Sequence, residues 1–328
     1  MIVDWHNHYY PPEYLDALRH GSSVKVTMDG QGNPLLHYPG DYNIAVRGHR
    51  DIAYRESVLE EAGVDLQVIT LTSPGTHVET RARAIELASL VNDAFAEVMR
   101  TRRRFVGLAA LPLNDPAAAV REFDRATGSL GLPGALLFSN VNGVALTDGA
   151  FWPLFEAADA RGAVFFIHPI HPVGVEAMEE YWLMPLVGFP MDTTLAAAKL
   201  VFSGVVERFP RIRWVLGHLG GAIPYLAERL DRGFHAFAEC RRNIRRPPSE
   251  YLKQQFYYDT VNFDPAALRL ALQFAGPDHI VAGSDYPHQI GSIPRMLESI
   301  AALGLDARER SAVLGGNALR LLGRERSV

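Results

Sequence analysis

The feature that most constrains the fold of this chain is an alternation of eight short apolar runs with longer helical patterns. The runs are rich in Val, Ile, Leu and Phe, which is typical of strands buried on both faces of a parallel sheet. Strands alternating with helices connect by right-handed crossovers, and eight such units predict a closed barrel. The predicted strands are Ile2–Trp5, Asp65–Leu71, Phe105–Leu111, Ala135–Ser139, Val164–His168, Arg213–Gly217, Phe256–Asp259 and Ile280–Gly283.

Helices are predicted between these strands, and several of them have clear start signals. In Asn114-Asp115-Pro116 and in Asp264-Pro265, a capping side chain precedes a proline of the first helical turn. The tail Ala307–Leu322 is expected to form two short helices outside the barrel. The other predicted helices are about Ile52–Ala62, Thr76–Thr101, Pro116–Thr127, Gly149–Arg161, Thr193–Phe209, Ile223–Glu239, Pro265–Ala275 and Ile293–Ala302.

Two segments interrupt this repeat, residues 9–50 after the first strand and residues 169–192 after the fifth. Both follow the carboxyl ends of strands, the side on which barrel enzymes build their substrate pockets. We therefore predict a single domain over residues 1–328, an α/β protein of the (β/α)8 TIM-barrel class with loop insertions after strands 1 and 5.

The composition excludes several classes of protein. The net charge is −5 and no lysine- or arginine-rich block dominates, so a nucleic-acid partner is not expected. A single cysteine, Cys240, excludes an internal disulfide and a cysteine-cluster metal site. Neither a signal peptide nor a long uncharged apolar stretch is visible, which predicts a cytoplasmic protein without a membrane span.

His6 and His8 stand at the end of the first apolar run. Residues i and i+2 of a strand point to the same face, so the two imidazoles project together. Neutral imidazole is a good ligand for zinc and related ions. Alone the pair is a weak signal, since a chain of 328 residues with 12 histidines can contain such a pair by chance.

Three further candidates also lie at strand ends: His168, His218 and Asp285. A lone histidine there is more often simply hydrogen-bonded, but the carboxyl ends of barrel strands meet at one mouth. The joint pattern therefore predicts a metal site. Asp259 also ends a strand, but we interpret it as a helix cap or a supporting group and leave it out of the ligand set. His288 lies near the predicted mouth and could contact substrate or simply be a surface residue.

The chain resembles the amidohydrolase superfamily, and within it the branch that contains aminocarboxymuconate-semialdehyde decarboxylase and aromatic-acid decarboxylases. The likeness spans nearly the whole chain, and its most specific part is residues 181–224. The segments that carry it are Asp4–His8, Tyr181–Thr194, Gly204–Pro210, Gly217–Pro224, Phe256–Thr260, Gly283–Pro287 and Gly316–Ala318.

This resemblance implies one divalent metal ion, usually zinc, held with a water by His6, His8, His168 and Asp285. Manganese also suits this ligand set. His218 matches the catalytic histidine of the family, which handles the proton of the water, and Asp285 could share in proton transfer.

The resemblance also implies substrate-binding residues. Trp182 matches an aromatic residue of the substrate pocket. Arg229 matches an arginine that reaches the substrate carboxylate of a neighbouring subunit, which implies a homodimer. For a second substrate-binding arginine, Arg47 is the nearest candidate. The chain departs from one example of the branch at Leu219, where that example has glycine, and at His288, where it has phenylalanine.

The expected activity is the non-oxidative decarboxylation of an unsaturated or aromatic carboxylic acid, a small molecule. The alternative is a hydrolase or hydratase that uses the same metal-bound hydroxide on a lactone, an amide or a C=C bond. A barrel that keeps the site only for folding is disfavoured, because an unliganded His218 beside the metal has no structural purpose.

Overall fold

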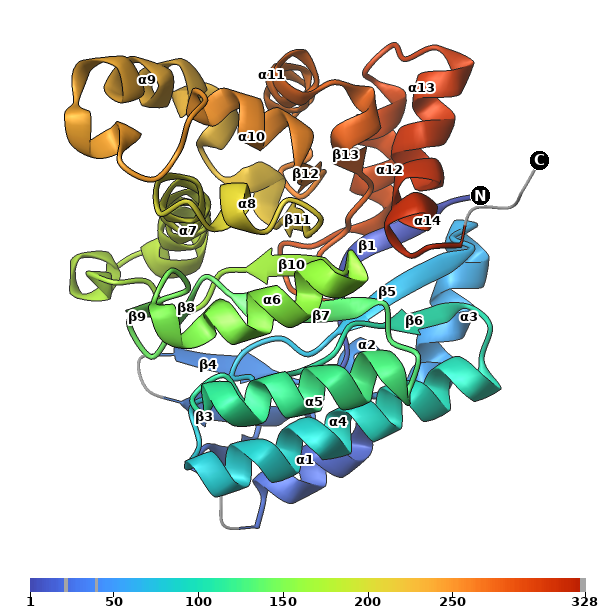
Figure 1. The fold of residues 1–328 in the computed structure, drawn as a ribbon. Coiled ribbons are helices and arrows are strands. Elements are labelled where there is room, and N and C mark those ends of the chain that lie inside the picture. The colour runs from blue at the N-terminus through green and yellow to red at the C-terminus, as the bar shows by residue number, and fades with distance from the viewer. Residues whose placement is uncertain (21–22, 39–40, 325–328) are drawn as a thin grey trace.

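A computed structural model describes residues 1–20, 23–38 and 41–324, and it contains the predicted barrel of parallel strands surrounded by helices (Figure 1). The strands pair in the orders β1-β5-β6 and β7-β10-β11-β12-β13, all in parallel. They are β1 (Val3–His8), β5 (Leu66–Thr70), β6 (Phe105–Gly107), β7 (Gly134–Phe138), β10 (Val164–His168), β11 (Arg213–Leu216), β12 (Phe256–Asp259) and β13 (Ile280–Val281).

Backbone hydrogen bonds join the two sheets at both seams and so close the barrel. Between β6 and β7, the amide of Ala109 donates to the carbonyl of Gly134 at 2.9 Å. Between β1 and β13, the amide of Trp5 donates to the carbonyl of Ala282 at 2.8 Å. The amide of Asp285 then donates to the carbonyl of His6 at 2.7 Å, so the closing seam runs directly into the mouth of the barrel.

The eight predicted strands are confirmed, and their burial explains why they could be recognised. Every residue of β1, β5, β7 and β10 is buried, since one face of a barrel strand fills the interior and the other packs against helices. Such strands are continuous apolar runs in the sequence. The exceptions are polar residues such as Asp4 and His6, which lie in the interior of the barrel or at its mouth and are also completely buried.

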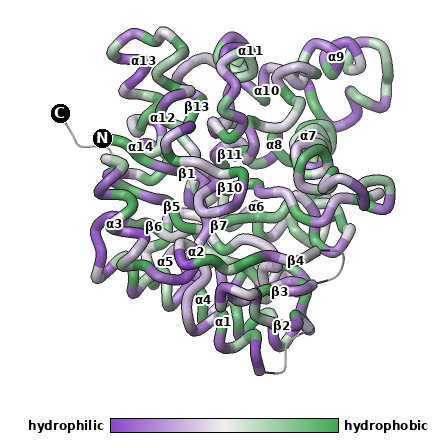
Figure 2. Tube along the Cα trace, turned by 180° about the vertical axis from the view of Figure 1, so that it is seen from behind, coloured by the Kyte–Doolittle hydropathy of each residue, from purple (hydrophilic) through white to green (hydrophobic). Residues whose placement is uncertain are grey.

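The helices cover the outside of the barrel, and Figure 2 shows hydrophilic stretches on outer helices such as α3 and α13. Asp115 and Asp264 cap their helices as predicted, accepting from the amides of Ala118 at 3.0 Å and Ala266 at 3.1 Å. None of the described helices is long and apolar enough to cross a membrane. The helices are α3 (Ile52–Ala62), α4 (Arg81–Thr101), α5 (Pro116–Gly128), α6 (Trp152–Arg161), α7 (Phe189–Phe202), α8 (Val205–Arg208), α9 (Ile223–Ala236), α10 (Pro248–Gln254), α11 (Pro265–Ala275), α12 (Ile293–Ala301), α13 (Ala307–Ser311) and α14 (Asn317–Leu321).

The helix predicted over Thr193–Phe209 differs from the structure at its start and in its middle. It begins at Phe189, with Pro190 in its first turn, and it divides into α7 and α8. The break lies at Gly204, whose φ of 83° is a left-handed conformation that glycine adopts at little cost and that ends a helix.

The segment 9–50, predicted as a loop, contains regular structure of its own, although residues 21–22 and 39–40 lie outside the described part. It includes a three-stranded antiparallel sheet in the order β2-β3-β4, placed at one end of the barrel (Figure 1). The second insertion contains short helical turns at Val175–Met178 and Met184–Gly188. The elements of the first insertion are α1 (Pro12–Leu18), β2 (Lys25–Met28), β3 (Pro34–Tyr38), β4 (Asp41–Ile44) and α2 (Arg47–Arg50).

Candidate metal centre

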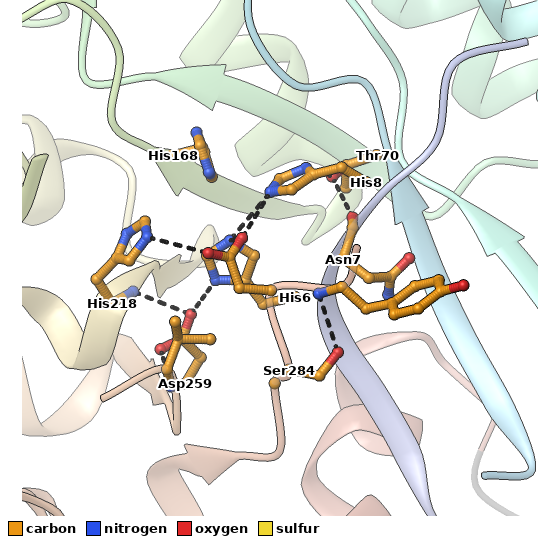
Figure 3. A network of polar contacts seen from close by, with 12 residues as sticks. His6, Asn7, His8, Thr70, His168, His218, Asp259 and Ser284 are labelled. Carbon is orange, nitrogen blue, oxygen red and sulfur yellow. Dashed lines mark hydrogen bonds and ion pairs between the residues drawn. The ribbon is translucent and has the colours of Figure 1, made fainter. Parts of the chain in front are cut away.

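The predicted ligands meet at the carboxyl end of the barrel, where Figure 3 shows four histidine side chains turned toward a common region. His6 and His8 come from β1, and their Nε2 atoms are 3.2 Å apart. Oδ1 of Asp285, in the loop after β13, lies 3.3 Å from both of these nitrogens. His168 ends β10, and its ring centre lies 4.6 Å from that of His8. The four predicted ligands are therefore neighbours.

Two overlapping groups of possible ligand atoms, each within 4.8 Å of one another, share Asp285. One group contains His6, His168 and His218, and the other contains His8 and His288. His218 lies slightly further from the carboxylate than the others, with its Nε2 3.9 Å from Oδ2 of Asp285. The structure thus brings together all five residues that were predicted as ligands or as catalytic groups.

The Nδ1 atom of each predicted histidine ligand is already engaged by a protein oxygen. Nδ1 of His6 lies 2.5 Å from Oδ2 of Asp259, and Nδ1 of His8 lies 3.0 Å from Oγ1 of Thr70. Nδ1 of His168 lies 2.7 Å from the carbonyl of Pro169. A hydrogen bond at Nδ1 orients the ring and leaves Nε2 as the nitrogen available to a metal ion. This is the arrangement expected of histidines that bind metal.

Asp259, left out of the predicted ligand set, supports several parts of the centre at once. Besides His6, its carboxylate accepts from the amides of His218 at 3.0 Å, Leu219 at 2.7 Å and Val261 at 3.0 Å. Its position at the end of β12 was visible in the sequence, but the contact to His6 was not. Asp259 therefore has the supporting role that was one of its two predicted interpretations.

The turn after β11 is held in an unusual backbone conformation. His218 and Leu219 have φ values of 53° and 58°, in the left-handed region that non-glycine residues rarely adopt. The amides of both residues point at the Asp259 carboxylate. These charge-assisted hydrogen bonds offset the strain and direct the His218 side chain into the mouth of the barrel.

Asp285 also has a positive φ, 57°, and is held by a second buried carboxylate. Asp4, at the start of β1, accepts from the amide of the preceding residue, Ser284, at 2.9 Å and from its hydroxyl at 2.6 Å. Burial raises the pKa of Asp4 to about 6, although these hydrogen bonds oppose the shift. The loop that presents Asp285 is thus fixed to the first strand.

The charges of the centre favour a cation. Burial opposes protonation of His6, but the charges of Asp259 and Asp285 outweigh it and raise the pKa of His6 to about 10. Burial lowers the pKa values of His8 and His168 well below the ordinary value. It also lowers the pKa of His218, to about 4. His8 and His168 are therefore neutral imidazoles at neutral pH, as a metal ion requires of its ligands. The two carboxylates that retain a proton on His6 would favour a metal cation in its place.

A further observation indicates that these side chains fit a divalent ion. Oδ1 of Asp285 is buried and has no hydrogen-bond partner among the described residues, although an unpaired buried carboxylate oxygen is costly. It faces the Nε2 atoms of His6 and His8. A bound cation would satisfy this oxygen and both nitrogens together.

A cavity of about 370 Å³ opens above these ligands. His168, His218 and Asp285 lie in its lining, together with His288. Its walls come from the first insertion, from the loop after β5, from the segment leading into α7 and from the loop after β13. The aromatic and apolar residues of the wall are Tyr38, Tyr42, Ile44, Val46, Trp182, Pro185, Leu186, Phe189, Pro287 and Ile290.

Of the three predicted substrate-binding residues, only Trp182 is part of this wall, where its ring lies 5.8 Å from that of Tyr42. Arg47 does not line the cavity, because its guanidinium pairs with Asp51 at 2.9 Å and lies over a tyrosine ring. Arg229, on α9, is exposed and lies outside the lining, which is compatible with the prediction that it reaches the site of a neighbouring subunit. Among the described residues, no arginine or lysine lines the cavity.

Comparison with known proteins gives consistent matches over nearly the whole chain. The family model described as amidohydrolase matches residues 3–324. The 2-amino-3-carboxymuconate-6-semialdehyde decarboxylase of Dictyostelium discoideum is 36% identical over 332 residues, which cover 98% of this chain and 92% of that protein.

Solved structures agree with these matches. The 5-carboxyvanillate decarboxylase of Sphingomonas paucimobilis has a TM-score of 0.86 at 28% identity and covers 98% of both chains. A dihydroxybenzoic acid decarboxylase of Polaromonas sp. JS666, solved with manganese and the inhibitor 2-nitroresorcinol, has a TM-score of 0.83 at 25% identity, with 99% of this chain and 98% of that chain covered. The chain belongs to the amidohydrolase family.

Proposed function

We propose that this protein is a metal-dependent carboxy-lyase that removes CO2 from an unsaturated or aromatic carboxylic acid. The observation that carries the proposal is the set of three histidines anchored through Nδ1, which converge with Asp285. One of these histidines, His168, and Asp285 line an aromatic cavity. The similar proteins of Dictyostelium, Sphingomonas and Polaromonas are all named decarboxylases, which favours this activity over others that the same ligand set could support.

In this proposal His6, His8, His168 and Asp285 hold one divalent ion. Three imidazoles and one carboxylate suit zinc and also manganese, which the similar Polaromonas enzyme contains. We propose zinc as the resident ion with manganese as the alternative. Metal analysis of the purified protein, together with turnover after reconstitution of metal-free protein with each ion, distinguishes the two.

The reaction breaks the bond between the carboxyl carbon and its neighbour, and the electron pair stays on that neighbouring carbon. A bound divalent ion would polarise the carboxylate or an adjacent oxygen and stabilise the negative charge that develops. The carbon must then take up a proton as CO2 leaves. His218 and Asp285 line the cavity, and we assign to them the transfer of this proton from solvent to the carbon.

A release assay tests the proposal against the hydrolase and hydratase alternatives. The metal-loaded protein is incubated with carboxyl-labelled aromatic and muconate-type acids, and in parallel with a panel of lactones, esters and amides. We expect labelled CO2 from at least one acid and no turnover of the second panel. Hydrolysis of a lactone, ester or amide without CO2 release from any acid would contradict the proposed activity.

We also infer that the protein is a homodimer. Seven of the large hydrophobic side chains that are exposed in the described part of the chain fall between residues 173 and 195, beside the cavity. Exposed apolar side chains concentrated in one segment are typical of a protein interface. The seven residues are Val173, Tyr181, Trp182, Leu186, Val187, Met191 and Leu195.

The mass in solution tests this inference. Light scattering on the purified protein is expected to give twice the mass of one chain, and Val187→Glu is expected to give a monomer. Leu270→Glu is the matched control, since it places the same charge on an exposed leucine of α11, far from the segment in sequence. A monomeric wild-type protein would contradict the inference.

A further inference from the structure

His288 is a polar side chain of the cavity to which no role has yet been assigned. It lies three residues after Asp285, is half-buried and lines the cavity. Its ring makes no hydrogen bond or ion pair to any described residue, whereas each predicted histidine ligand is anchored through Nδ1. An imidazole that faces a cavity without a protein partner is available to a bound molecule.

Neighbouring aromatic rings pack against His288 and hold it in place. Its ring centre lies 5.0 Å from that of His8 on one side and 4.9 Å from that of His49 on the other. Tyr10 stacks on His49 with ring centres 5.2 Å apart, and its amide donates to the carbonyl of His49 at 2.7 Å. His288 is therefore packed between the candidate metal centre and residues of the first insertion.

His49 is itself unusual, because it is 1% exposed and neither ring nitrogen has a hydrogen-bond partner among the described residues. Burying unpaired ring nitrogens costs free energy, which a phenyl ring in the same place would avoid. Its ring meets that of His288 at 64°, in an edge-to-face contact. His49 therefore differs from a residue that only packs, because it places a polar ring beside His288.

The position of the His288 ring relative to the Asp285 carboxylate limits which part of a bound substrate the ring can contact. One of its ring nitrogens lies within 4.8 Å of ligand atoms of His8 and Asp285. His218 belongs to the other group of ligand atoms, with His6 and His168, so His218 and His288 approach Asp285 beside different neighbours. A substrate carbon that receives its proton from His218 therefore leaves His288 facing a neighbouring substituent of the substrate.

We propose that His288 is a specificity-determining residue that hydrogen-bonds an oxygen substituent next to the carboxylate of the substrate. One ring nitrogen of His288 lies within 4.8 Å of two ligand atoms, so an oxygen of a molecule bound at the metal can lie within hydrogen-bond distance of it, about 2.7 Å. The cavity then selects acids with a hydroxyl or carbonyl oxygen beside the carboxylate. This inference rests on the proposed function only in that the ligand is an acid bound at the metal.

Binding measurements on the manganese-loaded protein test the proposal without requiring turnover. The probes are 2,6-dihydroxybenzoate and benzoate, which differ only in the two oxygens beside the carboxylate. His288→Phe keeps a ring of similar size and removes the hydrogen bond. We expect it to bind 2,6-dihydroxybenzoate about five- to tenfold more weakly and benzoate unchanged. His77→Phe, at a buried histidine outside the cavity lining, is expected to change neither affinity.

Each other outcome overturns the proposal. If His288→Phe loses the metal ion, His288 is a ligand; if both probes weaken equally, it contacts the carboxylate or only packs. If the variant binds both probes like wild type, or if the wild type does not prefer the hydroxylated probe, no such contact exists. CO2 release is measured separately, so a protein that prefers the hydroxylated probe but releases no CO2 from any acid would keep this inference and reject the proposed activity.

The double variant tests the role of His49. If His49 acts only by positioning His288, then His49→Leu weakens binding of 2,6-dihydroxybenzoate, and adding it to His288→Phe has no further effect. Benzoate affinity is measured as well, because a general loss of packing would lower it and a loss of positioning would not. Additive losses for both probes would show that His49 does not act through His288.

Discussion

At the scale of single residues, one carboxylate connects the ligands to the proposed proton-handling group. Asp259 holds Nδ1 of His6 and accepts from the amides of His218 and Leu219. All of its contacts are donors, so the position needs an acceptor with full charge. Replacing it by an amide would place an NH2 group against at least one N–H.

Asp259→Asn should therefore weaken metal binding, because His6 loses the partner that fixes its orientation. Loss of such a partner typically lowers metal affinity by about 10- to 100-fold. Competition with a chelator measures this affinity. The matched control is Asp278→Asn, which removes an exposed ion pair with Arg308 and should leave affinity unchanged. Equal affinities in both variants would remove the role assigned to Asp259.

A variant of His218 tests proton transfer separately from metal binding. His218→Asn should keep the metal ion, because four other residues are assigned to hold it, and should lower CO2 release by about 10²–10⁴-fold, the usual contribution of an acid–base group. Metal content and turnover are measured on the same sample. Loss of the ion in this variant would instead place His218 among the ligands.

At the scale of elements, the sequence predicted those parts of the chain that bury continuous apolar runs. All eight barrel strands were found, since β5, β7 and β10 have no exposed residue. The strands β2 and β3 were missed, because both are short, partly exposed and bounded by polar or proline residues. Their pairing depends on contacts that no periodicity in the sequence reveals.

The candidate site also has a part that the sequence predicts and a part that depends on tertiary contacts. The positions of His6, His8 and His168 at strand ends predicted that these residues lie near one another, because the carboxyl ends of barrel strands meet at one mouth. Which protein oxygen supports each histidine depends on the register between strands and on loop conformation. The partner of His6 therefore became clear only from the structure.

The wall formed by the two insertions should control substrate affinity without affecting the metal. Trp182 lies against Tyr42 and lines the cavity, and an aromatic contact between its ring and a bound substrate would contribute about 0.5–1.5 kcal/mol. Trp182→Ala is expected to raise KM by about 2- to 15-fold with metal content unchanged. Trp152→Ala, a tryptophan outside the cavity lining, is the control for loss of an indole. Unchanged KM in Trp182→Ala would exclude it from the substrate pocket.

At the scale of the whole molecule, buried histidines should make the fold sensitive to acid. Burial lowers the pKa of His77 to about 4, below its value of about 6.5 in an unfolded chain. Between these values only the unfolded state binds the proton, so stability is complete above pH 6.5 and falls as the pH decreases toward 4. The loss from this residue is about 3 kcal/mol in total.

His77→Phe removes this contribution, and denaturant unfolding at several pH values measures it. The free energy of unfolding of the variant should depend less steeply on pH between 6.5 and 4 than that of the wild type. Parallel curves for the two proteins would show that His77 is protonated equally in both states.

The closure of the barrel brings the first strand against the last, and only then do His6 and Asp285 become neighbours. The central claim is that this closure creates one catalytic metal site per chain. Titration of metal-free protein with zinc or manganese, followed by CO2 release, tests it most directly. Activity should be absent without metal and should rise linearly to a plateau at one ion per chain. Full activity without metal, or a plateau at two ions, would contradict the claim.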